Sequence, residues 1–146
     1  MKKLIYPFLF IIFLAACNKG PYYPPEGVWR SEEPNIILYI KPEYLSTAEP
    51  NKHPGVYTTV DGDEIKVFTR FSMLTPMLEI FDLATAFHES GGILWEANLF
   101  AGSYRLINNQ LRFTAGRNPT NSGPIVIIFH RLEEYDPINP NDWFPN

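Results

Sequence analysis

His88, Glu89 and Ser90 are the residue types of a hydrolytic triad, which needs a base, an acid and a nucleophilic hydroxyl. The three groups of a triad converge on one point, whereas adjacent residues diverge on a helix and alternate between the two faces of a strand. Asp82 lies six positions before His88 and would not share its face of a helix. The chain also lacks a Gly-x-Ser-x-Gly motif. These patterns predict a protein that is not an enzyme.

Metal ligation has equally little support in the sequence. The histidines, His53, His88 and His130, are far apart and fall in a loop, an ambiguous segment and a strand. Glu133, Glu134 and Asp136 could bind a cation, but a solvated, charged exit from the last strand is the favoured interpretation. A single cysteine rules out an intrachain disulfide and a cysteine cage. We therefore expect neither a metal nor a cofactor.

Arg105 and Arg112 are the candidate ligand-binding residues. The guanidinium group binds carboxylates through paired hydrogen bonds. If the two side chains pointed into a barrel, they would anchor an acidic or amphipathic ligand there. If they pointed outward, they would be two solvated arginines, and the sequence favours this second placement.

The only cysteine, Cys17, stands at the end of an N-terminal segment with two lysines and an apolar run from Leu4 to Leu14. That run is shorter than the about 20 apolar residues of a membrane-spanning helix. The sequence Leu-Ala-Ala-Cys over residues 14–17 resembles the lipobox of bacterial lipoprotein signal peptides. The resemblance implies cleavage of residues 1–16, a diacylglycerol on the sulfur of Cys17 and an acyl chain such as palmitate on its amino group, which together anchor durably. The alternative is an ordinary secretory signal.

Residues 17–26 are expected to form a lipidated, proline-rich tether that holds a domain off the membrane. Asn18 stands where the lipoprotein family's inner-membrane retention signal has Asp, so the resemblance implies a bacterial cell envelope location, with the outer membrane favoured over the inner. Loss of Lys2 and Lys3 with the prefix lowers the net charge from −4 to −6. This acidic balance argues against nucleic acid as a partner.

Residues 27–135 carry the two-residue apolar periodicity of a β domain, and the proline- and asparagine-rich residues 136–146 are expected to be an irregular tail. Strands are predicted at 27–31, 36–41 and 125–132, with a loop at 42–54. The last strand is apolar on both faces up to Phe129, so it should be central or sealed within a barrel.

Two hairpins are predicted. Asp61-Gly62 favours a two-residue turn that pairs Thr58 with Ile65 and Val56 with Val67 on the buried face. In the second hairpin Asn108-Asn109 forms the turn, which places Leu106 opposite Leu111 and Tyr104 opposite Phe113. The same register places Arg105 beside Arg112 on the other face.

Residues 75–90 allow two interpretations. Their apolar side chains fit a helical stripe, with Thr75 as cap, Pro76 at the first helical position and Gly91-Gly92 at the end, which predicts a helix at about 75–89. The alternative is a hairpin around Gly91-Gly92. The helix is the favoured prediction.

Gly27 and Trp29 open the first strand and Arg131 lies near the end of the last, an arrangement that resembles the lipocalin superfamily. The resemblance implies an antiparallel meander barrel or half-barrel, with structural roles for these three residues and an arginine packed across the indole. It also implies binding of a small apolar or amphipathic ligand, as a non-catalytic role at the cell envelope. The alternative function is a protein-interaction lipoprotein of the enzyme-inhibitor or immunity type.

Overall fold

The computed structural model describes residues 25–40, 52–72, 74–87 and 92–133. Several predicted segments lie outside the described residues: the signal segment, Cys17, most of the tether and the tail. Residues 42–51 of the predicted 42–54 loop lie outside them as well. Among the residues described, no helix has the length and apolar character needed to cross a membrane.

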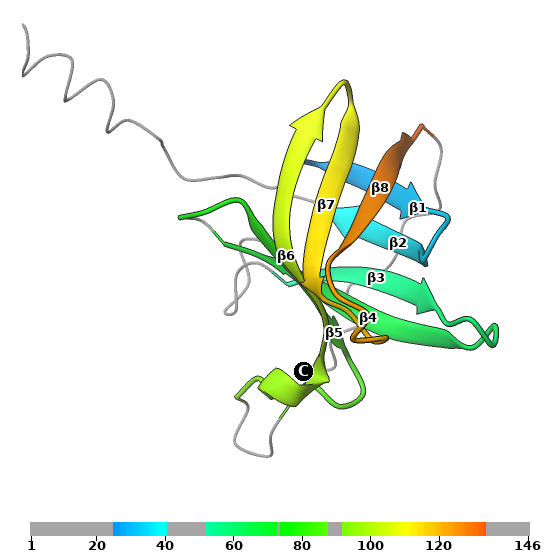
Figure 1. The fold of residues 1–146 in the computed structure, drawn as a ribbon, viewed down its shortest axis with the longest axis vertical. Coiled ribbons are helices and arrows are strands. Elements are labelled where there is room, and N and C mark those ends of the chain that lie inside the picture. Colours follow the sequence, from blue (N-terminus) through cyan, green and yellow to red (C-terminus); the bar gives the residue numbers. More distant parts are fainter. Residues whose placement is uncertain (1–24, 41–51, 73, 88–91, 134–146) are drawn as a thin grey trace, which may run out of the picture.

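Eight strands form a closed antiparallel barrel in which each strand pairs with the next and β8 pairs with β1 (Figure 1). The strands are β1 Gly27–Ser31, β2 Asn35–Ile40, β3 His53–Thr58, β4 Glu64–Phe71, β5 Met77–Asp82, β6 Asn98–Ile107, β7 Gln110–Arg117 and β8 Ile125–Leu132, with the short 3-10 helix η2 at Trp95–Ala97. This confirms the predicted mainly β, lipocalin-like antiparallel meander. The last strand is sealed between β7 and β1, as its two apolar faces predicted.

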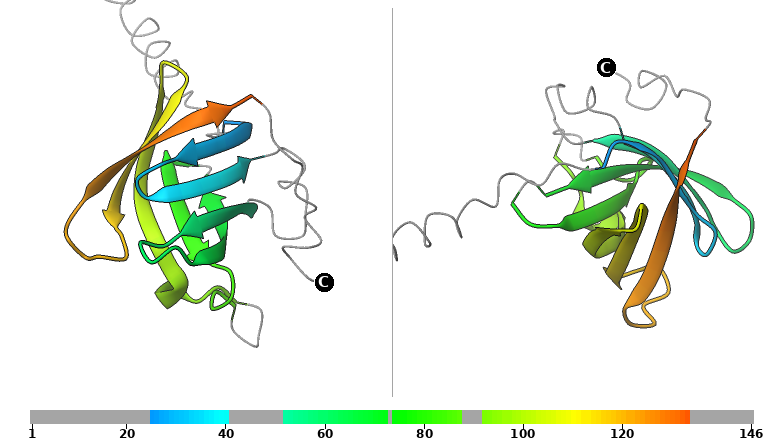
Figure 2. Two further views of the ribbon diagram at one scale, coloured as in Figure 1. Left: turned by 90° about the vertical axis from the view of Figure 1, so that its right-hand side faces the viewer. Right: turned by 90° about the horizontal axis from the view of Figure 1, so that it is seen from above.

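The barrel has two ends. The start of β1, the β4–β5 and β6–β7 turns and the end of β8 lie at one end, which we call the hairpin end. The connections β1–β2, β3–β4, β5–β6 and β7–β8 lie at the other, which we call the hollow end. Figure 2 shows from the side and from above how the strands curve around one interior. An eight-stranded barrel is just wide enough for side chains to fill it.

That interior is packed with apolar side chains. Trp29, Leu38, Phe71, Phe113 and Phe129 are each at most 1% exposed and belong to one continuous cluster. Full burial of each such side chain contributes about 1.5–3 kcal/mol, so this cluster is the main source of stability.

The β6–β7 hairpin has the predicted register. Asn108 and Asn109 both have positive φ, 48° and 61°, which is the geometry of a two-residue turn that follows the strand twist. Leu106 pairs with Leu111, and Arg105 pairs with Arg112.

The predicted register of the β3–β4 hairpin is wrong by one residue. Gly62, with φ of 89°, donates its N–H to the carbonyl of Thr59 at 3.0 Å, and the N–H of Thr59 donates to the carbonyl of Asp63 at 2.9 Å. The loop is therefore a three-residue turn with a glycine bulge. The shift pairs Tyr57 with Ile65 and turns both side chains toward the core.

The helix predicted at about 75–89 is wrong, because residues 77–82 form β5. Leu78 and Ile80 face the core, while Phe81 faces outward and stacks on Phe68 with ring centroids 5.0 Å apart. Residues after β5 cover this outer pair, and Phe87 forms an isolated bridge with Ile93. Since the outer face of β5 also carries the apolar side chains of Met77 and Phe81, its two-residue period is hidden and a helical stripe fits by coincidence.

Candidate functional site: a hollow at one end of the barrel

A hollow of about 540 Å³ opens at the hollow end, within the about 300–1,000 Å³ of small-molecule sites. Three connections that are distant in sequence enclose it, namely β1–β2, β3–β4 and β7–β8. Most of the lining atoms are apolar. The lining residues are Glu32, Glu33, Pro34, Asn35, Tyr57, Thr58, Thr59, Val60, Phe100, Asn118, Pro119, Thr120 and Ile125.

The floor of the hollow is the top layer of the barrel core. The rings of Tyr57 and Phe100 meet edge to face, with centroids 5.3 Å apart and an interplanar angle of 89°. Ile125 packs against the same cluster. Because the interior beneath them is filled, a ligand would occupy the mouth of the barrel and not its centre.

Asn118 shapes the β7–β8 side of the rim. This residue is 3% exposed, and its amide donates to the carbonyl of Gly123 at 2.7 Å. Its Oδ1 accepts from the backbone N–H of Thr120 at 3.2 Å and from the Thr120 hydroxyl at 2.6 Å. These three bonds fix a loop that otherwise contributes few buried apolar groups.

The β1–β2 side of the rim is built by short polar contacts. The hydroxyl of Ser31 donates to the carbonyl of Pro34 at 2.6 Å, and the amide of Asn35 donates to the Thr58 hydroxyl at 3.2 Å. The second bond ties this turn to β3. Glu32 and Glu33 lie exposed on the turn, so the rim carries negative charge above an apolar floor.

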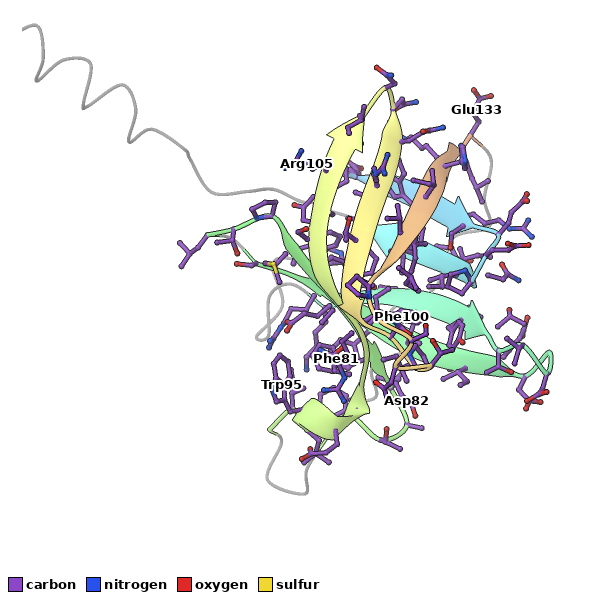
Figure 3. The ribbon with its side chains drawn as sticks, in the orientation of Figure 1. Phe81, Asp82, Trp95, Phe100, Arg105 and Glu133 are labelled. Atoms are coloured by element: carbon purple, nitrogen blue, oxygen red, sulfur yellow. The ribbon has the colours of Figure 1, made fainter. Side chains whose placement is uncertain are left out.

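The structure places the two candidate arginines away from this hollow. Arg105 and Arg112 pair across the β6–β7 ladder on the outer face of the barrel, and both are exposed. Figure 3 labels Arg105. With Ser103, Ile107 and Thr114 they line a separate, mostly polar hollow.

Gly27, Trp29 and Arg131 come together where the barrel closes at the hairpin end. Trp29 pairs directly with Arg131 across the β1–β8 ladder. Gly27 has a φ of 136°, and a Cβ at this position would lie 2.8 Å from Nε of Arg131, so the guanidinium group packs on the glycine backbone. The indole N–H of Trp29 donates to the carbonyl of Pro25 at 3.0 Å.

His53 and His130 occupy opposite environments. His53, expected in a loop, begins β3 and is fully buried, with its ring 5.6 Å from that of Phe71 in an edge-on arrangement. Burial lowers its pKa from 6.5 to about 4. His130 is exposed on β8, and His88 lies outside the described residues.

Sequence reasoning missed the hollow, because its lining residues come from three turns and from the four strands β2, β3, β6 and β8. The only local signal was the clustering of turn-forming residues at 118–124. Comparison of this chain with known protein families, characterised proteins and solved structures found no match. The fold and site therefore define its class on their own: a small, closed, antiparallel β-barrel with a filled interior and one apolar hollow at its mouth.

Proposed function

We propose that this protein is a lipid-anchored, non-catalytic binding protein of the bacterial cell envelope, and that it holds a small amphipathic ligand in the hollow. The observation that carries the proposal is the apolar floor of Tyr57, Phe100 and Ile125 beneath a polar rim. Ligand sites commonly combine a largely apolar lining with a few polar groups that fix orientation.

The rim defines the chemistry of the ligand further. Thr58, Thr59 and Thr120 offer hydroxyl groups, and Glu32 and Glu33 offer negative charge. Among the residues that the structure describes, no basic side chain lines the hollow. We therefore expect a ligand with a compact apolar part and a neutral or positively charged polar part, since a carboxylate would meet the two glutamates.

The location rests on the sequence. Cys17 is proposed to carry the lipid, and the tether joins it to the start of β1 at the hairpin end. The hollow then opens at the opposite end of the barrel, away from the anchor. A ligand would enter from the aqueous side of the envelope.

Binding of the neutral fluorescent probe N-phenyl-1-naphthylamine tests this site. Ile125→Trp fills the hollow, whereas Val126→Trp places the same bulk one residue further along β8, at a side chain that is 48% exposed. We expect Ile125→Trp to weaken binding about tenfold, the equivalent of about 1.4 kcal/mol of lost contact, and Val126→Trp to leave it unchanged. Equal effects of the two variants would contradict the proposal.

A protein partner is the second candidate occupant of the hollow end. Val60 at the β3–β4 turn is 97% exposed and lines the hollow, so its side chain is accessible to a partner at this end of the barrel. An inhibitor or immunity lipoprotein would use this turn to enter an enzyme. It would then co-purify with a stoichiometric protein that Val60→Asp releases, and it would retain no small molecule.

A further inference from the structure

The hairpin end presents large apolar side chains to solvent on two adjacent turns. Leu106 and Ile107, at the β6–β7 turn, are 55% and 45% exposed, and Leu74 at the β4–β5 turn is 87% exposed. The two turns are tied together, because the N–H of Tyr104 donates to the carbonyl of Pro76 at 2.9 Å. Apolar side chains grouped in this way mark an interaction surface.

The β6–β7 turn extends further than the neighbouring β4–β5 turn. Ser103 is the last β6 residue paired with β5, and β6 continues to Ile107. Four further residues of β6 therefore run ~13 Å past its ladder with β5, while β7 stays paired with β8 as far as Gln110. Figure 1 shows this hairpin reaching furthest at the top of the view.

Positive charge lies just behind the apolar tip. Arg105 and Arg112 face each other across the hairpin, and within the described part of the chain neither makes an ion pair. Like charges in this position are unfavourable unless an anion separates them. The hydroxyls of Ser103 and Thr114 line the same hollow, so the group presents donors suited to a phosphate.

The opposite end of the barrel has the opposite charge. Glu32, Glu33, Asp61, Asp63 and Glu64 are exposed on or beside two turns of the hollow end, where they outnumber the exposed Arg30, Lys66 and Arg117. At the hairpin end the exposed acids Glu26 and Glu133 line a hollow with Arg131, so with Arg105 and Arg112 this end carries three arginines against two acids among the described residues. An anionic surface would therefore attract the hairpin end and repel the hollow end.

We propose that the hairpin end docks on an anionic phospholipid bilayer, with Leu106, Ile107 and Leu74 in the interfacial region and Arg105 and Arg112 on lipid phosphates. This inference rests on the proposed anchor. Ten residues separate Cys17 from Gly27, so the start of β1 lies at most about 35 Å from the lipidated cysteine. The docked barrel holds its hollow open toward solvent at a fixed orientation.

The test uses the mature lipidated protein in vesicles of phosphatidylethanolamine and phosphatidylglycerol. Since Cys17 is the only native cysteine and its sulfur would be blocked, Gln110→Cys adds one reactive thiol near the hairpin tip. Ser122→Cys adds a matched thiol in the β7–β8 loop at the hollow end. Each is labelled with a nitrobenzoxadiazole fluorophore, and quenching by a lipid-bound nitroxide is measured.

We expect quenching and a blue-shifted emission for Gln110→Cys and neither for Ser122→Cys. Each arginine near an anionic surface contributes about fivefold to the ratio of docked to undocked protein, so Arg105→Gln with Arg112→Gln should lower it about 25-fold. Equal quenching at the two labels, or no effect of the arginine variants, would overturn docking alone. Thiol labelling of the wild-type protein at Cys17 would overturn the anchor and the docking inference with it.

Discussion

His53 makes the stability of the barrel depend on pH between about 6.5 and about 4. Its imidazole is fully buried, and desolvation lowers its pKa from 6.5 to about 4. Between these values the unfolded chain binds a proton that the native protein does not bind. The free energy of unfolding therefore falls as the pH is lowered from about 6.5 to about 4, and the stabilisation is complete above 6.5.

The size of the effect follows from the two pKa values. Linkage of one proton with pKa values of 6.5 and about 4 gives a loss of about 2 kcal/mol by pH 5 and about 3 kcal/mol by pH 4. Since small domains have about 5–15 kcal/mol of total stability, this loss on acidification is a large share of it.

Urea denaturation followed by tryptophan fluorescence from pH 7 to pH 4 measures this loss. His53→Leu should flatten the dependence over that range, whereas His130→Gln, which removes an exposed histidine, should leave it unchanged. A wild-type protein equally stable at pH 7 and pH 5, or a His53→Leu variant with the wild-type slope, would refute the reasoning.

Three further changes have defined outcomes. Gly102→Ala should cost about 3 kcal/mol by urea denaturation, because the new Cβ would collide with the backbone of Thr114, whereas Gly116→Ala has its nearest atom at 3.9 Å and should be near neutral. Asn118→Ala should cost about 2 kcal/mol and weaken probe binding, since it removes three bonds of the β7–β8 loop. Glu79→Gln breaks the 2.8 Å ion pair with a partly exposed Arg70 and should cost under about 1 kcal/mol, a difference that about 1 M salt abolishes.

Local sequence predicted the strand register correctly where a single turn determines it. Asn108-Asn109 permits two successive positive φ angles, and the register of β6 and β7 follows from that turn. Asp61-Gly62 was misleading because glycine fits both a two-residue turn and a three-residue turn with a bulge. The choice between them depends on burying Tyr57 and Ile65 against a core that local sequence does not show.

A strand that is covered on both faces, such as β5, is also hard to recognise by its periodicity. Local sequence does not show which residues cover its outer face. Phe81 looks like a core residue of a helix because its partner Phe68 lies on a neighbouring strand of the outer face. The hollow could not be predicted, because Tyr57, Phe100 and Ile125 meet only when the barrel closes. The two arginines were visible in the sequence, but their side of the sheet was settled only by the closed barrel.

Native mass spectrometry of the protein extracted gently from its membrane is the most direct test of the proposed binding role. The proposal predicts a lipid-modified chain with one small molecule retained, which Ile125→Trp abolishes and Val126→Trp preserves. A chain that carries no small molecule in either the wild-type or the Val126→Trp form would contradict it.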